Sequence, residues 1–268
     1  MAVRGGLLVI GFLSLAFAAG FCFQLGWALA LWPWPDTELS YIFIGSIAAA
    51  IGVPVLWVAL TGEIGAAAAG ALNLVVILGG GAVVLMQLGL ARGDTPLRGY
   101  AAGWAILALG SLSIFLWSRR IPVRDGRPMP RLVRASFVGF AVVLVLVGVA
   151  LELQAPDVLP WRVLPESSLL FGCIFLGPVV YFTYGAAQNR WHTACGQLLG
   201  FLAYDLVLIG PFLAHWSTVV PEQRTSLLIY IAVLLYSGAL AVYFLFFNSG
   251  TRLWRPQPPK RAASTIYR

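Results

Sequence analysis

Eight long apolar stretches, none of which contains Lys or Arg, run through this chain of 268 residues. A bilayer core ~30 Å thick requires about 20 apolar residues per helix, within a working range of roughly 17–25. Strands of a membrane barrel would alternate polar and apolar residues, and these stretches do not alternate. The sequence therefore predicts an all-α polytopic bundle of eight transmembrane helices. The predicted spans are Leu7–Leu31, Tyr41–Leu60, Ala66–Ala91, Ala101–Trp117, Ala135–Leu153, Leu169–Ala187, Cys195–Trp216 and Leu227–Asn248.

Composition excludes the soluble classes. Hydrophobic residues make up 60% of the chain, charged residues only 10%, and the mean hydropathy is +0.89. A soluble domain usually carries about a quarter charged residues, so this chain has too little polar surface to cover a water-facing globule. Three widely spaced Cys do not form a disulfide scaffold.

The distribution of basic residues orients the predicted spans. With the N-terminus placed in the cytoplasm, the outside loops hold only four of the 17 basic residues, namely Arg92, Arg98, Arg162 and Arg224. This bias follows the positive-inside rule for an even number of spans with both termini inside. We therefore interpret the net charge of +7 as orientation against an anionic inner leaflet, not as nucleic-acid binding. The expected location is a plasma membrane of the bacterial inner-membrane type.

The two halves of the chain resemble each other weakly. Similar Trp- and Pro-containing loops follow the first and fifth spans, and the segment around Asn73 matches the segment around Asp205, at offsets between 127 and 132 residues. These matches predict a tandem four-plus-four repeat, whose halves would run in the same direction across the membrane. The expected organisation is a first half over 1–134, a second half over 135–248 and a basic Pro-rich cytoplasmic tail over 249–268.

Asp205 is the sharpest chemical feature, because it lies in the middle of the seventh predicted span. A charged Asp at the bilayer centre costs ~2.5–3.5 kcal/mol on insertion scales, and no span holds a Lys or Arg to pair with it. Asp205 is therefore either protonated, or stabilised by hydrogen bonds and a bound cation. An alternative of equal weight is that it is a hydrogen-bonded structural residue that sets helix register.

A proton or small-cation site would draw its polar groups from neighbouring helices. Pro178 in the sixth span frees the carbonyl of Ile174, and that span is the expected neighbour of the seventh. The residues expected to bind the ion or proton are Asp205, Asn73, Tyr181, Tyr184, Tyr204 and Gln197. The residues expected to pack helices closely are Gly196, Gly200, Ala203 and Pro178.

Two basic segments, the loop over 118–134 and the tail, are predicted to be unstructured or interfacial. Basic residues near an anionic surface gain ~1 kcal/mol each. Those expected to contact anionic lipid are Arg119, Arg120, Arg124, Arg127, Arg131, Arg134, Lys260 and Arg261.

No known catalytic or metal motif is present, and we expect no cofactor or metal. The leading hypothesis is a non-enzymatic accessory or assembly subunit that packs against other membrane proteins, lipids or a second copy. The alternative is a proton- or cation-coupled transporter or channel that uses Asp205, and a membrane-embedded lipid-modifying enzyme ranks third. Enzymatic activity is left open, with a non-enzyme favoured.

Overall fold

The computed structural model describes residues 2–122 and 124–253. In this part of the chain all regular structure is helical, and eight helices are long and apolar enough to cross a membrane. The predicted all-α bundle with eight spans is confirmed, and it indicates a multi-pass integral membrane protein. The long helices are α1 (Ala2–Cys22), α3 (Glu38–Thr61), α4 (Ala67–Ala91), α5 (Thr95–Ser118), α6 (Arg131–Glu152), α7 (Pro165–Gln188), α8 (Trp191–His215) and α9 (Arg224–Val242). The short elements are α2 (Gly26–Leu29), η1 (Ile64–Ala66), η2 (Pro221–Gln223) and the π-helix η3 (Tyr243–Phe247).

The first span is shorter than predicted. Apolar residues continue to Leu31, but α1 ends at Cys22 and the chain turns there, with Gln24 in the left-handed region at φ 51°. The residues beyond the turn form the short helix α2, at the end of the bundle where α1 ends. Hydropathy alone does not register such a turn, because every residue around it except Gln24 is apolar or Gly.

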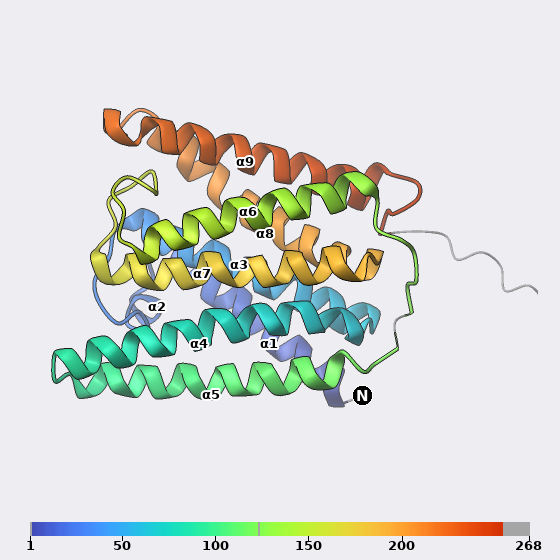
Figure 1. Ribbon diagram of the computed structural model, residues 1–268, viewed down its shortest axis with the longest axis horizontal. Helices are drawn as coiled ribbons and strands as arrows, with labels where there is room; N and C mark the ends of the chain where they lie inside the picture. The colour runs from blue at the N-terminus through green and yellow to red at the C-terminus, as the bar shows by residue number, and fades with distance from the viewer. Residues whose placement is uncertain (1, 123, 254–268) are drawn as a thin grey trace, which may run out of the picture.

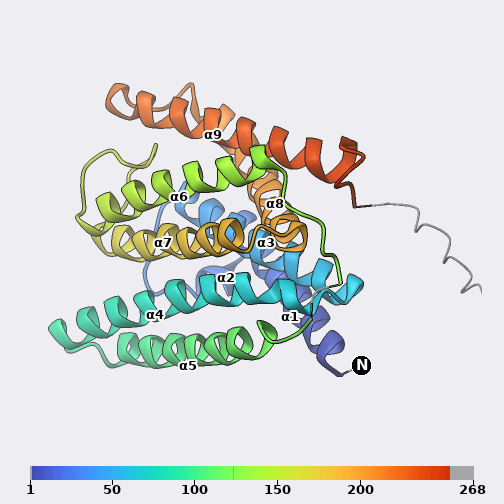
Figure 2. The same ribbon diagram turned by 45° about the vertical axis from the view of Figure 1, so that its right-hand side comes forward.

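The long helices form two layers, and each layer mixes the two halves of the chain. The main contacts run α1–α3–α8–α9 in one layer and α5–α4–α7–α6 in the other. Figure 1 shows α5, α4, α7 and α6 stacked in this order in front, with α1, α3 and α8 behind them. Figure 2 keeps the order of the front layer after the turn of the view. The predicted halves over 1–134 and 135–248 are therefore intertwined in space.

Helix bounds in the two halves correspond closely. Helices α3 and α7 both have 24 residues, and they begin at Glu38 and Pro165. Both end at a left-handed residue, Gly62 with φ 76° and Asn189 with φ 50°. The same offset in the sequence therefore separates the two helix starts and the two helix ends. The helices of the first half, α1, α3, α4 and α5, can be exchanged in order with α6, α7, α8 and α9 of the second half. This exchange turns each layer into the other, and every main helix contact keeps a counterpart.

Both described chain ends lie at the same end of the bundle (Figure 1). This end also carries Arg4, the loop after α5 and the turn between α7 and α8, and it is called the basic end below. The opposite end carries α2, Asp36, Asp94 and Glu166.

Candidate functional site

Asp205 is buried where α8 packs against α9, with 5% of its surface exposed. Ser237 on α9 is its hydrogen-bond partner, with Oγ at 3.0 Å from Oδ1 and 2.9 Å from Oδ2. The Ser237 hydroxyl also lies 2.8 Å from the carbonyl oxygen of Val233 one turn earlier. A Cβ at Gly238 would lie 3.4 Å from Oδ2, so the absence of a side chain there lets α9 approach the carboxyl. No sequence pattern linked Ser237 to Asp205, which are 32 residues apart.

The structure brings only some of the predicted ion-binding residues together. Tyr204, next to Asp205, pairs its hydroxyl with that of Tyr230 at 2.5 Å. Tyr184 of α7 points along its own layer, away from Asp205, and its ring meets Phe115 of α5 edge-on with centroids 6.0 Å apart.

Two further predicted residues form a separate contact between α7 and α8. The Gln197 side-chain amide donates to the backbone carbonyl of Tyr181, and its buried Oε1 has no hydrogen-bond partner among the described residues. Asn73 lies on α4 against α7, and its buried Oδ1 likewise has no partner in the part of the chain that the structure describes. The six residues that were expected to bind the ion or proton therefore lie at several helix interfaces, and they do not line one common cavity.

The small-residue face of α8 packs mainly on α3, not on α7 as chain order suggested. A Cβ at Gly200 would lie 2.9 Å from the Ala50 carbonyl oxygen and 3.4 Å from Pro54, both on α3. A Cβ at Gly196 would lie 3.3 Å from the Tyr181 hydroxyl and 3.7 Å from Trp57. Ala203 continues this face as a half-buried residue.

Two close helix crossings involve residues separated by the same sequence offset. At the crossing of α4 and α7, a Cβ on Gly177 would clash with Asn73 and Ile77. At the crossing of α8 and α3, a Cβ on Gly200 would clash with Ala50. Gly200 lies 127 residues after Asn73, and Gly177 lies 127 residues after Ala50, so the two crossings correspond. At this offset Asn73 aligns with Gly200, and Asp205 aligns with Leu78.

Two tryptophan–serine hydrogen bonds connect the halves reciprocally at the end opposite the basic end. Trp34 Nε1 donates to Ser167 Oγ at 2.7 Å, and Trp161 Nε1 donates to Ser40 Oγ at 2.9 Å. Each Trp precedes the Ser of its own half by six residues, but it bonds the Ser of the other half. Such an exchange is what a local two-fold relation between the halves would produce.

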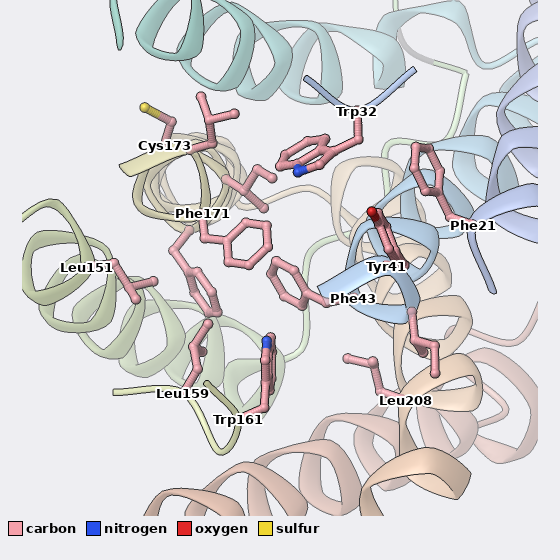
Figure 3. Close-up of a cluster of buried hydrophobic side chains, with 14 of the residues drawn as sticks. Phe21, Trp32, Tyr41, Phe43, Leu151, Leu159, Trp161, Phe171, Cys173 and Leu208 are labelled. Atoms are coloured by element: carbon pink, nitrogen blue, oxygen red, sulfur yellow. The ribbon is translucent and has the colours of Figure 1, made fainter. Parts of the chain in front are cut away.

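Aromatic rings fill the space between the layers on this side of the bundle. Phe43 of α3 packs against Phe171 and Phe175 of α7, with ring centroids 4.9 and 5.5 Å apart. Trp161 lies 5.7 Å from Phe43, and Trp32 lies 6.1 Å from Phe171. Figure 3 shows Phe43 and Phe171 facing each other between these two indoles. The centre of the bundle is therefore packed with apolar side chains here.

Glu152 is a second carboxyl group within a span, and sequence reasoning missed it. It lies at the last residue of α6, and the Cys173 thiol of α7 lies 3.2 Å from its Oε1. A Cβ at Gly172 would clash with Glu152, so the carboxyl group is held against the α7 backbone. The signal was present in the sequence, because Glu152 falls inside the predicted fifth span.

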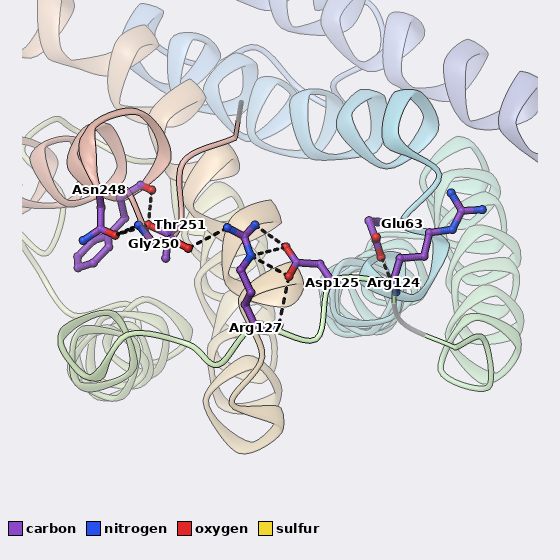
Figure 4. Close-up of polar contacts among 8 residues, drawn as sticks. Glu63, Arg124, Asp125, Arg127, Asn248, Gly250 and Thr251 are labelled. Atoms are coloured by element: carbon purple, nitrogen blue, oxygen red, sulfur yellow. Dashed lines mark hydrogen bonds and ion pairs between the residues drawn. The ribbon is translucent and has the colours of Figure 1, made fainter. Parts of the chain in front are cut away.

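The basic loop is folded against the protein instead of being unstructured. Trp191 N donates to Arg127 O at 2.8 Å, and Arg127 Nη1 donates to the carbonyl oxygen of Gly250 at 2.9 Å. Arg124 N donates to Glu63 at 3.2 Å, which ties the loop to the turn between α3 and α4. Figure 4 shows the contacts of Arg127 with Gly250 and of Arg124 with Glu63.

An ion pair stabilises this loop. Arg127 Nη2 lies 2.5 Å from Asp125 Oδ2, and Arg127 Nε lies 2.8 Å from Oδ1. Burial alone would raise the pKa of Asp125, but the hydrogen bonds and positive charge of Arg127 outweigh it and hold that pKa below its ordinary value. Hydrogen bonding to Asp125 likewise raises the pKa of Arg127.

The predicted lipid-contacting residues thus divide into two sets. Arg124 and Arg127 are engaged by the protein, as described above. Arg119, Arg120, Arg131 and Arg134 are exposed at the basic end. Lys260 and Arg261 lie outside the described residues, as does most of the predicted tail.

Two cavities stand out, and both are apolar grooves between adjacent helices of the front layer. One, of about 500 Å³, runs between α4 and α5, and the other, of about 570 Å³, runs between α6 and α7. Neither includes Asp205. Among the described residues, no group of three or more His, Cys, Asp or Glu side chains is arranged to hold a metal ion.

Comparisons with protein-family models, with curated proteins and with solved structures give no match for this chain. What the fold defines is a class: a multi-pass integral membrane protein built from eight apolar helices.

Proposed function

We propose that the protein is a non-enzymatic membrane subunit that supports the assembly of other membrane proteins. The observation that carries this proposal is the aromatic packing between the two layers. In transporters built from two parallel repeats, the substrate site lies near the midplane at the repeat interface. Here part of the corresponding interface is occupied by Phe43, Phe171 and Phe175, packed ring against ring. Close aromatic packing on this side of the interface suits a scaffold better than a passage for a polar solute.

The proposal includes the four-plus-four repeat. It is supported by the reciprocal bonds of Trp34 and Trp161 and by the matching crossings at Gly177 and Gly200. Because four spans separate equivalent residues, the halves run in the same direction and their relating axis lies along the helices. This axis passes between the layers, through the region that the aromatic rings fill.

The peripheral helices supply the surfaces for partners. Of the eight spans, α5, α1 and α6 have the smallest buried shares. Gly103 on α5 has open space where a Cβ would point, with nothing within 4 Å, so a photoreactive amino acid fits there without disturbing the fold. Leu170 on α7 is fully buried and serves as the internal control.

The test is photocrosslinking in native membranes from Gly103 and from an exposed position on α6 outside its groove, Val143. An assembly subunit is expected to give discrete crosslinked protein products from at least one exposed position, and to co-purify with the same partner in mild detergent. Leu170 should give only intramolecular products. A stable monomer that yields lipid adducts alone from both exposed positions would refute the proposal.

The second candidate function is proton-coupled transport through Asp205, and one observation favours it. A serine hydroxyl has a single proton to donate. If Asp205 is neutral, its carboxyl donates to Ser237 Oγ, and Ser237 is free to donate to the Val233 carbonyl 2.8 Å away. If Asp205 is ionised, the Ser237 hydroxyl instead donates its hydrogen bond to the carboxylate. The contact therefore has two hydrogen-bonding states that differ by one proton.

Proton flux into proteoliposomes that contain the Asp205→Asn variant distinguishes the two candidate functions. The control is Glu222→Gln, which removes an exposed acidic residue. A transporter should lose proton flux in Asp205→Asn while Glu222→Gln retains it. A scaffold should show no proton flux in either protein and keep its partner in both. Infrared carboxyl bands, compared between wild type and Asp205→Asn across pH, report directly whether Asp205 changes its protonation.

A further inference from the structure

The groove between α6 and α7 has an apolar floor and a cation at one end. Its lining includes Val138, Ala141, Val145 and Leu146 from α6 and Thr183 from α7, and Arg134 stands at the basic end. From Arg134 to Leu146 a helix rises ~18 Å at 1.5 Å per residue. Half of a bilayer core is ~15 Å thick. The groove therefore spans about one leaflet, with its charge at the depth of the headgroups.

The same chain contains a matched interface without a groove. Under the proposed repeat, the α1–α3 pair corresponds to the α6–α7 pair. Cys22 and Glu152, the last residues of α1 and α6, are as many residues apart in the sequence as Arg4 and Arg134 near the starts of these helices. In the α1–α3 pair, the Leu56 side chain packs directly on Gly11, 2.6 Å from where a Cβ would lie. The residue 127 positions after Leu56 is Thr183, which is shorter. The groove therefore occurs where a smaller side chain stands in place of leucine.

The arginine at the basic end also differs between the two interfaces. Arg4 in α1 corresponds to Arg134 in α6. Arg4 is bound by its own protein, because Nε donates to Ala59 O and Nη2 donates to Leu60 O, both at 2.7 Å. The exposed Arg134 side chain makes no hydrogen bond or ion pair with the residues that the structure describes. Its guanidinium is available to a ligand.

We propose that this groove binds one anionic phospholipid of the leaflet at the basic end. One acyl chain lies along α6 and α7, and the phosphate pairs with Arg134, whose planar guanidinium donates two parallel hydrogen bonds to phosphate oxygens. Arg131, one helical turn earlier and also exposed, adds positive charge beside the headgroup. The α4–α5 groove provides a contrast, because its lining residues carry no charge.

The test is native mass spectrometry of the full-length protein with phosphatidylglycerol or phosphatidylcholine of identical acyl chains. Wild type is expected to retain one phosphatidylglycerol in preference to phosphatidylcholine. One basic residue near an anionic surface contributes ~1 kcal/mol, which corresponds to about fivefold in binding. Arg134→Gln should therefore lower phosphatidylglycerol retention about fivefold. It should lower phosphatidylcholine retention less, because the choline ammonium already offsets the charge of the phosphate that both lipids carry. Arg120→Gln, which removes an exposed charge at the same end, should have little effect.

A second variant tests the acyl-chain part of the site. Thr183→Leu restores the side chain found at Leu56 and should lower retention of both lipids by the same factor. If Arg120→Gln acts as strongly as Arg134→Gln, the lipid is held by diffuse charge and the proposal fails. If folded Thr183→Leu binds as wild type does, the acyl chain lies elsewhere and the proposal also fails.

A measurement on the unaltered protein removes any dependence on the folding of variants. Phosphatidylglycerol with a photoreactive group on its acyl chain is expected to label peptides from α6 and α7, including Val138–Leu146. Equal labelling of the corresponding face of α1 and α3 would show general lipid contact and overturn the proposal. Crosslinks from this groove to a second copy of the chain would identify a protein as its occupant and overturn it as well.

Discussion

The hydrogen bond from Trp161 to Ser40 offers the sharpest test of the relation between the two halves. The Trp161 side chain is 4% exposed and Ser40 is completely buried, so the indole N–H has no access to water. Its donor–acceptor distance is 2.9 Å. Ser40→Ala leaves that donor without its partner, and an unsatisfied buried group costs ~1–3 kcal/mol. We expect the free energy of unfolding to fall by an amount in this range.

A double-mutant cycle isolates the bond itself. Trp161→Phe removes the N–H and some ring area, and the double variant shows whether the two losses are independent. Coupling energies between transmembrane helices average ~0.6 kcal/mol and reach ~1.7 kcal/mol. Because this site is dry and the geometry is good, we expect coupling in the upper half of that range. Ser167→Ala with Trp34→Phe tests the equivalent bond of the other half.

The assay is reversible unfolding in mixed micelles, followed by far-ultraviolet circular dichroism. This signal reports helix content and is insensitive to the loss of one indole. Substitutions at independent sites add to within ~0.3–0.5 kcal/mol, so a smaller coupling at both sites would refute the idea that the reciprocal bonds hold the halves together. A coupling energy at one site only would show that the two reciprocal hydrogen bonds do not contribute equally to stability.

Three further outcomes follow from the same contacts. Gly177→Ala should destabilise the fold by ~1–3 kcal/mol through overpacking against Asn73 and Ile77. Gly103 has open space around it, so Gly103→Ala should stabilise its helix by up to ~1 kcal/mol. Unfolding in micelles compares the two variants. Arg4→Gln should cost ~0.3–1 kcal/mol in the same assay, because it removes bonds to the last carbonyls of α3, while Arg134→Gln should cost nothing measurable. The folded pKa of Asp125 is lowered by Arg127, so this pair stabilises the basic loop above the ordinary aspartate pKa of about 3.9, and the contribution is lost as the pH falls through the lower folded value. Limited proteolysis of the loop across acidic pH should show this loss in wild type and not in Asp125→Asn.

Hydropathy and charge predicted the number of spans but not their neighbours. An apolar stretch records that a helix is surrounded by lipid or protein, and it does not record which helix it meets. Chain order therefore suggested α7 as the partner of the small face of α8, whereas Gly200 packs against Ala50 and Pro54 of α3. The partner of Asp205 was missed for the same reason, since Ser237 is one of several hydroxyl residues on apolar helices.

Two signals in the sequence give different registers for the proposed repeat. Matching apolar segments pairs Asn73 with Asp205, but segments built from a few residue types also align by chance. The spacing of Trp34 to Ser40 recurs unchanged in Trp161 to Ser167. Polar hydrogen-bonding pairs are rare in such a chain, so their spacing carries more information about register than runs of Leu, Val and Ala.

Under the proposed repeat, the places where the halves differ indicate where function was added to a shared frame. Equivalent positions would begin with the same packing role, and a buried polar residue is costly to keep without a purpose. Asn73 is matched by Gly200, and Asp205 is matched by Leu78, so each of these polar groups belongs to one half only. The α6–α7 groove is equally one-sided, because Leu56 fills its counterpart. A chain serving only as a symmetric spacer would gain nothing from these differences. The experiments on Asp205 and Arg134 therefore address the two strongest departures from symmetry.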